Sequence, residues 1–265
     1  MSKVLGIDIS AYQTNDYNNP SRFFDPYVAR DKDIKFAILR ASIGTVKDRA
    51  VEHFAEEFNK AGIPISFYHF LYNGVSYTSQ ADFFCNIVRY KSYQLPLFVD
   101  VEMNGVGLDM VRRFIGRVEA KLNKPVWIYS SPSFWNSLIG VDRAEWVLNK
   151  EYWVANYIKP PTASYLHELP DGYPNENMPK ELKPFIGKKS WKFWQFTSSG
   201  DGRYFGGDYP AHSKPVGLDL DVYNGTVEQF NEEFGSAISP PQSEFGMVRV
   251  IARQPDGKPG CLFFR

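Results

Sequence analysis

The chain has 265 residues, enough for two ordinary domains or for one α/β barrel, since such barrels commonly have about 250 residues. The sequence contains 30 basic and 30 acidic residues, so the formal net charge is zero, which removes the electrostatic argument for nucleic acid or an anionic membrane as the main partner. The aromatic content of 16% fits either a large core or the stacking of aromatic rings on sugars.

Cys85 and Cys261 are the only cysteines, and their separation matches neither a disulfide framework nor a metal-ligand spacing. We therefore expect no metal site and no cofactor. The N-terminus leads directly into a predicted strand, without a charged leader, a long apolar core or a cleavage site. No apolar run is long enough to span a membrane. The sequence thus predicts synthesis in the cytoplasm without a signal peptide.

Short apolar runs alternate with amphipathic segments along most of the chain. The predicted strands cover residues 4–10, 36–42, 64–72, 95–102, 125–131, 153–157, 191–196 and 218–224. The predicted helices cover residues 48–62, 76–91, 111–122 and 226–234. Repeated alternation of strand and helix indicates a parallel sheet. Eight strands in about 230 residues favour a closed, TIM-like α/β barrel over a doubly wound sheet. The late strands have little helix between them, which predicts an irregular second half.

Two segments interrupt this pattern. Residues 158–190 are rich in Pro, Gly and charge and are too long for an ordinary βα loop, so we interpret them as a wall of the site or a surface insertion. Residues 236–243 have the composition of a linker. We therefore expect a barrel domain at 1–235 and a short β-rich extension at 244–265. That extension is either a docked tail or the start of a further module.

Asp100 and Glu102 stand two residues apart at the end of an apolar predicted strand. Side chains on a strand alternate between faces, so both carboxyl groups should point the same way, with their α-carbons about 7 Å apart. Two buried like charges at that distance favour protonation of one of them, and a neutral acid beside an ionised one suits general acid catalysis on an ether-like bond. The alternative is a strand end whose acids lie in water or pair with Lys or Arg. The motif alone favours that alternative.

Acids and aromatic residues also occur at the ends of the other predicted strands. In a barrel, the carboxyl ends of the strands form the active-site face. Asp8 ends the first predicted strand, and Asp219 and Asp221 lie in the last. The ends of the strands between them carry Tyr68, His69, Tyr129, Tyr157, Trp194 and Gln195. This gathering shifts the balance towards a carbohydrate site.

Eight sequence pieces resemble one known family, the glycoside hydrolase family 25 muramidases, or Chalaropsis-type lysozymes. They are GIDISAYQ at 6–13, FAILRASIGT at 36–45, FYHF at 67–70, FVDVE at 98–102, WIYSS at 127–131, WVANY at 153–157, WQFTSSG at 194–200 and LDLDVYNG at 218–225. They follow the order of the family and cover roughly residues 3–235. Each piece alone is weak, but eight in register are specific.

The resemblance implies a barrel of five βα units and three closing strands that cleaves the β-1,4 bond after N-acetylmuramic acid. Glu102 matches the general acid, and Asp100 matches its partner, which stays charged as either a nucleophile or the stabiliser of a substrate-assisted intermediate. Asp8 and Asp219 match two further acids of the cleft. The candidate substrate-binding residues are Tyr68, Tyr129, Tyr157, Trp194, Gln195 and Arg40.

Some residues have simpler interpretations. An ion pair of Arg40 with Asp8 or Asp48 is favoured over substrate contact, and Asp48 is also placed to cap the next helix. His69 is typical of a hydrogen-bonded buried histidine. Trp127, Trp135, Trp146 and Trp191 are expected in the core. The family often has Asn where this chain has Asp221, which shares a face with Asp219 and adds a charge of open consequence.

The resulting hypothesis is an N-acetylmuramidase that acts on bacterial peptidoglycan, as a monomeric barrel without nucleic-acid or membrane partners. We expect a bacteriophage or prophage endolysin that reaches the wall on release from the cytoplasm, with a secreted autolysin as the near alternative. Carboxyl separations of about 5–5.5 Å suit retention and about 6.5–9.5 Å suit inversion, and the acetamido group of the substrate favours retention with substrate assistance. The sequence is also compatible with a chitinase, an endo-N-acetylglucosaminidase or a non-catalytic wall-binding module.

Overall fold

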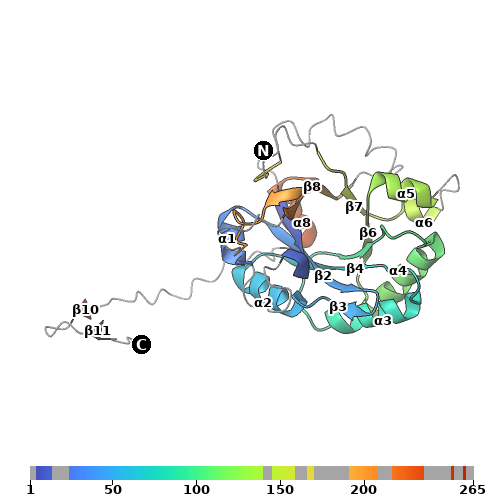
Figure 1. The fold of residues 1–265 in the computed structure, drawn as a ribbon, viewed down its shortest axis with the longest axis horizontal. Coiled ribbons are helices and arrows are strands. Elements are labelled where there is room, and N and C mark those ends of the chain that lie inside the picture. Colours follow the sequence, from blue (N-terminus) through green and yellow to red (C-terminus); the bar gives the residue numbers. More distant parts are fainter. Residues whose placement is uncertain are drawn as a thin grey trace.

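The fold is described by a computed structural model (Figure 1). The described residues are 4–13, 24–139, 145–158, 166–169, 191–207, 217–235, 252–253 and 259–260. Within these ranges, no helix is both long enough and apolar enough to cross a membrane.

Eight strands form a closed barrel. In the order in which they pair, these strands are β1 (Val4–Ile9), β2 (Phe36–Ile43), β4 (Ile65–Phe70), β5 (Leu97–Asp100), β6 (Val126–Ser130), β7 (Tyr152–Ala155), β8 (Phe193–Asp201) and β9 (Gly217–Tyr223). Neighbours from β1 to β8 are parallel, whereas β9 runs antiparallel to both β8 and β1 and closes the ring. A short strand, β3 (Val46–Lys47), lies outside the barrel, antiparallel to β2. The predicted closed α/β barrel is confirmed.

The helices follow one another around the outside of the strands in chain order, except the last, which lies at one end of the barrel (Figure 1). They are α1 (Pro26–Asp31), α2 (Val51–Ala61), α3 (Tyr77–Val88), α4 (Leu108–Leu122), α5 (Pro132–Ile139), α6 (Glu145–Leu148) and α8 (Val227–Phe234), with a 3-10 turn η1 at Ala11–Gln13. The described residues between β7 and β9 hold no helix. Among the described residues, β1, β2, β4, β5 and β6 each lead to a helix, whereas β7, β8 and β9 follow one another without one. The described part of the chain thus agrees with the irregular second half that the sequence predicts.

Local signals explain most element boundaries. Helix α2 buries Val51, Phe54 and Phe58 at helical spacing and ends at Gly62, whose φ of 74° is left-handed. The sequence analysis does not predict helix α1, although Asp25 caps it by accepting from the N–H groups of Tyr27 and Val28. It also misses helices α5 and α6 and strand β3, because each is too short to show a clear periodicity.

Strand alternation divides the apolar residues between two cores. The barrel interior is filled by aromatic rings, among them Phe36, Phe98, Trp127, Trp153 and Phe193. Phe230 of α8 stacks on Phe36 with 5.7 Å between ring centroids, so this helix closes the end of the barrel at which the parallel strands begin. The outer core, between strands and helices, contains Trp135, Trp191 and Trp194, with the half-buried Trp146 packed against it. The expected core positions of Trp127, Trp135, Trp146 and Trp191 are confirmed.

The two irregular segments lie largely outside the described residues. Within 158–190, the structure describes Ile158 and residues 166–169, where Leu166 bridges to Gly200 and Leu169 is buried. The predicted linker at 236–243 also lies outside the described residues. Beyond it, β10 (Ala252–Arg253) pairs antiparallel with β11 (Pro259–Gly260), as a hairpin requires. The division into domains remains a prediction.

Gly6 gives a test of how tightly the barrel interior is packed. A Cβ at this position would overlap the ring of Phe36, the residue that pairs with Gly6 in the register of β1 and β2. We expect Gly6→Ala to destabilise the fold by about 1–3 kcal/mol, measured as a lower Tm in a thermal scan. Gly116→Ala is the control, since Gly116 is an exposed position of α4 with no atom within 4 Å of the added Cβ. That variant should gain about 0.5–1 kcal/mol. An unchanged Tm in Gly6→Ala would contradict the tight packing.

Candidate active site

A polar cavity of about 160 Å³ opens at the carboxyl end of the parallel strands. Its lining consists of Asp8, Tyr68, Asp100, Glu102, Tyr129, Trp153, Tyr157, Gln195 and Asp219. Eight of the ten predicted site residues therefore meet in one place; the two that do not are Trp194 and Arg40. Trp153 is the lining residue that the sequence analysis did not select.

Strand alternation and strand direction bring these side chains together. Asp8 on β1 points inward, while its neighbours Ile7 and Ile9 pack in the outer core. Asp8 lies directly opposite Asp219 in the register between β1 and β9. Because β9 is antiparallel, its beginning lies at the rim where the parallel strands end. Asp219 therefore reaches the cavity from the start of its strand, and Asp221 lies one step deeper in the barrel.

Asp100 and Glu102 share the cavity as predicted but differ in depth. Strand β5 ends at Asp100, which is buried, whereas Glu102 follows the strand and is exposed. Burial raises the pKa of Asp100 well above its ordinary value, and the charges of Glu102 and Asp8 raise it further, while Arg40 lowers it. Burial also raises the pKa of Glu102. The open cavity thus favours protonation of Asp100, which the sequence analysis expected to stay charged.

Gln195 joins one acid to two tyrosines. Its Nε2 donates to Oδ2 of Asp8 at 2.6 Å. Its Oε1 accepts from the hydroxyl groups of Tyr129 and Tyr157, each at 2.9 Å. With both ends of the amide bonded, its orientation is fixed, and so are the positions of the two phenol rings at the cavity wall.

Asp221 lies beneath the cavity, fully buried, and bonds to two groups. Trp153 donates its indole N–H to Oδ1 of Asp221 at 2.7 Å. No amide, indole or hydroxyl donor among the described residues reaches Oδ2. A side-chain hydrogen bond also joins Asp221 to Asp8. Two carboxyl groups can bond in this way only when one of them is protonated, so the pair shares a proton.

Burial dominates the electrostatics of this pair. It raises the pKa of Asp221 to about 8, and the charge of Asp219 acts in the same direction. It also raises the pKa of Asp8 well above its ordinary value, aided by the charge of Asp221. Asp221 and Asp219 share the inward face, as predicted, while Leu220 packs in the outer core. Asp221 is therefore a hydrogen-bonded part of the site.

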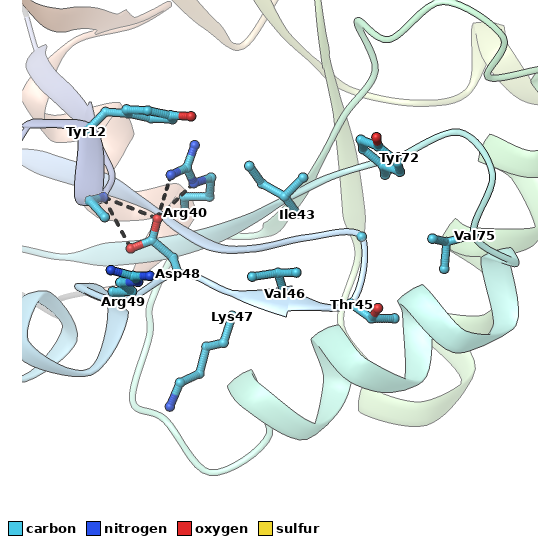
Figure 2. Close-up of a pocket in the computed structure, with 12 residues that line it drawn as sticks. Tyr12, Arg40, Ile43, Thr45, Val46, Lys47, Asp48, Arg49, Tyr72 and Val75 are labelled. Atoms are coloured by element: carbon cyan, nitrogen blue, oxygen red, sulfur yellow. Dashed lines mark hydrogen bonds and ion pairs between the residues drawn. The ribbon is translucent and has the colours of Figure 1, made fainter. Parts of the chain in front are cut away.

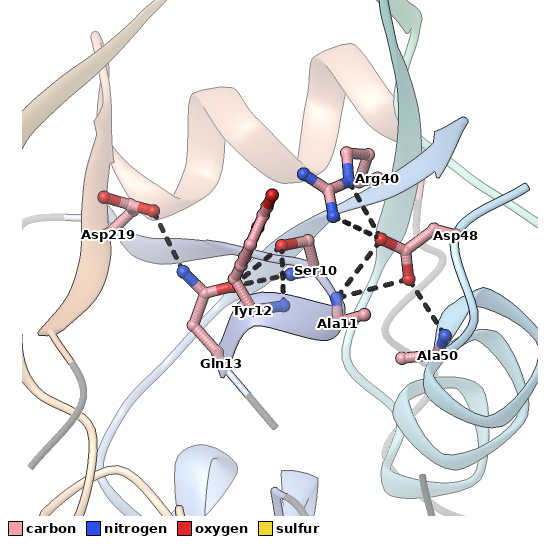
Figure 3. Close-up of polar contacts among 8 residues, drawn as sticks. All are labelled: Ser10, Ala11, Tyr12, Gln13, Arg40, Asp48, Ala50 and Asp219. Atoms are coloured by element: carbon pink, nitrogen blue, oxygen red, sulfur yellow. Dashed lines mark hydrogen bonds and ion pairs between the residues drawn. The ribbon is translucent and has the colours of Figure 1, made fainter. Parts of the chain in front are cut away.

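The turn after β1 holds one acid of the cavity, Asp219, through a hydrogen bond (Figure 3). Gln13 donates from Nε2 to Oδ2 of Asp219 at 3.3 Å. Its Oε1 accepts from the N–H and the hydroxyl of Ser10, so the amide of Gln13 is held in place. Burial, with the charges of Asp8 and Glu102, raises the pKa of Asp219 well above its ordinary value.

The prediction that Trp194 lines the sugar site is wrong. Its ring is fully buried in the outer core, 5.8 Å from that of Trp191, and its indole N–H donates to the carbonyl of Asn156 at 2.8 Å. Adjacent residues on a strand face opposite ways, and Gln195 faces in. Trp153 takes the inward position on the neighbouring strand instead. The alternation of residues 152–155 is the signal that could have identified it.

Arg40 lies beside the cavity, not in its lining. It forms the predicted ion pair with Asp48, at 2.8 Å, so the structure selects Asp48 over Asp8 as its partner. Asp48 also accepts from the N–H of Ala50 at 2.9 Å, at the start of α2, and from the N–H of Ala11. The predicted capping of α2 by Asp48 is wrong, because Ala50 is the N-cap residue and the helix has no side-chain cap; Asp48 bonds to the N–H of Ala50 itself (Figure 3).

His69 is confirmed as a hydrogen-bonded core histidine. It is fully buried on the outer side of β4, where Nδ1 lies 2.8 Å from the hydroxyl of Ser42 and Nε2 lies 3.1 Å from Oε1 of Gln80. Burial lowers its pKa to about 4, so the ring is neutral at neutral pH. Its place outside the cavity excludes contact with a substrate there.

A closed barrel with paired acids at the carboxyl ends of its strands has the architecture of glycoside hydrolases. The comparison with known families agrees: the family described as "Glycosyl hydrolases family 25" matches residues 7–203. The chain belongs to this family, and it is a glycoside hydrolase of the lysozyme type. It is also 28% identical to Lysozyme M1 of Streptomyces globisporus over 247 residues, which cover 85% of this chain and 69% of that protein.

Solved structures show the same fold. The bacterial lysozyme from Streptomyces coelicolor has a TM-score of 0.64 at 24% identity, covering 89% of this chain and 99% of its own. A family 25 glycosyl hydrolase from Bacillus anthracis has a TM-score of 0.62 at 22% identity, with coverages of 88% and 94%. The catalytic domain of endolysin ply40, from bacteriophage P40 of Listeria monocytogenes, has a TM-score of 0.58 at 21% identity, with coverages of 88% and 98%.

The shared proton of Asp8 and Asp221 predicts how one substitution alters stability. The pKa of Asp221 is raised to about 8, so between pH 4 and pH 8 the folded chain holds a proton that the unfolded chain releases. Its contribution to the free energy of unfolding therefore falls as pH rises through this range. An Asn side chain stays neutral, accepts from Trp153 and donates to Asp8. We expect Asp221→Asn to exceed the wild type in Tm at pH 8 but not at pH 4.

Asp221→Ala is the matched control, because it removes both hydrogen bonds and leaves the indole N–H of Trp153 without an acceptor. Its Tm should lie below that of the wild type at both pH values, as measured by calorimetry. An Asp221→Asn variant that is less stable than the wild type at pH 8 would show that the pair does not need a proton.

Proposed function

We propose that the protein is an N-acetylmuramidase that cleaves the β-1,4 bond between N-acetylmuramic acid and N-acetylglucosamine in bacterial peptidoglycan. The main support is the meeting of Asp100 and Glu102 with Asp8 and Asp219 in one small polar cavity. Membership of family 25 and the similarity to Lysozyme M1 point to the same reaction. The size of the cavity, about 160 Å³, matches a single sugar ring rather than a length of polymer.

Glu102 is the general acid in this proposal. It stands at the exposed edge of the cavity, where the glycosidic oxygen of a bound strand can reach it, and burial raises its pKa. A raised pKa keeps a carboxyl group protonated closer to neutral pH, as donation to a leaving oxygen requires. After the first step, the resulting carboxylate accepts a proton from the incoming water.

Asp100 stabilises the reacting group from below. Its carboxyl group is buried and lines the cavity, and among the described residues no hydrogen-bond donor reaches its Oδ1. The 2-acetamido group of the sugar can donate its N–H to this carboxyl group while its carbonyl oxygen attacks the anomeric carbon. The positive charge that then develops favours the ionised form of Asp100, which burial disfavours. Direct attack by Asp100 is the competing route to retention.

A bacteriophage or prophage endolysin is our proposal for the origin of the chain, supported by its likeness to the fold of endolysin ply40. Such an enzyme is made in the cytoplasm and meets peptidoglycan when the host membrane is breached. An endo-N-acetylglucosaminidase would use the same paired acids but would leave glucosamine at the new reducing end. A wall-binding module would release no reducing ends at all.

Substitution of Glu102 tests the assignment of the acid. Glu102→Gln keeps the shape of the side chain but cannot donate a proton, so we expect turnover of purified peptidoglycan to fall at least about 100-fold. Wall binding and Tm should be retained. Glu57→Gln, on the surface of α2, is the control and should have wild-type activity. Full turnover by Glu102→Gln would overturn the assignment.

The products identify the bond. Mass spectrometry of peptidoglycan digested by the wild type should show new reducing ends on N-acetylmuramic acid. New ends on N-acetylglucosamine would assign the endo-N-acetylglucosaminidase activity, and binding to walls without new ends would assign the binding module.

A further inference from the structure

A second, larger hollow lies beside the catalytic cavity, above strands β2 and β3 (Figure 2). Its volume is about 390 Å³. It is lined by Ala11, Tyr12, Arg40, Ile43, Gly44, Thr45, Val46, Lys47, Asp48, Arg49, Tyr72 and Val75. Arg40 affects both spaces. It lines this hollow, and its charge lowers the pKa of Asp100, which lines the catalytic cavity. The two spaces therefore lie close together, on either side of Arg40.

Large side chains around this hollow are unusually exposed. Val46 is 70% exposed, Tyr12 66% and Tyr72 43%, although each is apolar or aromatic. Exposed apolar groups that surround one concavity are typical of a binding surface. The hollow thus offers contacts to aliphatic groups, with the guanidinium of Arg40 over the ring of Tyr12 at 4.8 Å on one side.

The charges of the two spaces are opposite. The lining of the hollow carries Arg40, Lys47 and Arg49 against a single acid, Asp48, while Glu52, outside the lining, forms an ion pair with Lys47 at 3.2 Å. Both oxygens of Asp48 are already occupied by Arg40 and by backbone N–H groups. Asp48 accepts from Nε of Arg40 and forms an ion pair with its Nη2. Within the described part of the chain, Nη1 of Arg40 therefore has no protein partner. The catalytic cavity, in contrast, is lined by four acids and no cation.

This separation of charge matches the chemistry of a branched substrate. In peptidoglycan, the sugar rings are neutral, and each lactyl group on muramic acid carries a peptide stem with alanine methyl groups and free carboxylates. Carboxylates are repelled by the acidic cavity and attracted by the cationic hollow. Methyl groups fit the exposed apolar lining.

We propose that the hollow between Tyr12, Arg40, Val46 and Tyr72 binds the anionic peptide stem of peptidoglycan while the sugar occupies the catalytic cavity. This inference rests on the proposed function, since it concerns the same substrate. It assigns Arg40 to the stem, with Lys47 and Arg49 adding positive charge at the edge. The hollow then determines which walls the enzyme cleaves efficiently.

Val46 allows a charge to be changed without disturbing the core, because its side chain is mostly in solvent. We would compare Val46→Glu with Val46→Lys, two substitutions of similar size and opposite charge. The substrates are intact peptidoglycan and the same glycan after its stems are removed by an amidase. We expect the ratio of kcat/KM on intact to stripped glycan to fall about tenfold in Val46→Glu and to stay within twofold of the wild type in Val46→Lys. Added salt should weaken the effect of Val46→Glu.

Direct binding gives a second measurement that does not need turnover. Titration calorimetry with an N-acetylmuramoyl dipeptide should show at least threefold weaker binding to Val46→Glu than to the wild type, and no loss in Val46→Lys. An unchanged ratio and unchanged dipeptide binding in both variants would overturn the proposal. Equal losses on intact and stripped glycan would also overturn it, since the hollow would then hold sugar. A wild-type chain that cleaves neither glycan but shows the charge-dependent binding would refute the proposed function alone.

Discussion

Five carboxyl groups near one end of a single barrel are the constraint on which the rest of the site depends. Asp8, Asp100 and Asp221 are buried and Asp219 is partly buried, and the pKa of each is raised first of all by desolvation. Such a cluster persists only if protons or fixed donors compensate it. Trp153, Gln195 and Gln13 supply donors from three different elements. The tightly packed aromatic interior below them provides the stability that this arrangement requires.

The acids of the site lie at different depths in the barrel. Asp221 and Asp8 share a proton at the bottom, Asp100 lies at the end of its strand, and Glu102 stands at the exposed edge. Each step towards solvent reduces the desolvation that opposes ionisation. The residue nearest to solvent is therefore the one best able to give up a proton and take one back, which is the behaviour required of an acid that later acts as a base.

Much of this was predictable because strand alternation is a local property. It placed Asp100 with Glu102, and Asp219 with Asp221, on shared faces, while the strand-end rule placed Asp8 at the same rim and the order of apolar runs predicted the closed barrel. The family resemblance led to the prediction that Trp194 lines the sugar site. Alternation contradicts this, because adjacent residues such as Trp194 and Gln195 cannot both face the barrel interior. The partner of Arg40 and the antiparallel direction of β9 depend on contacts between distant segments, for which a single sequence carries no local signal. The second hollow also forms only when the turn after β1 meets the β2–β3 edge.

Asp48 determines that the turn after β1 becomes ordered during folding and not during ligand binding. Its carboxylate joins the turn after β1, the strand β2 and the start of α2, through Ala11, Arg40 and Ala50. The turn that carries Tyr12 and Gln13 is thereby immobilised when the chain folds, so its conformational entropy is lost before any glycan arrives. A ligand then meets a wall that is already preorganised, and more of its contact energy remains for affinity and for distortion of the sugar.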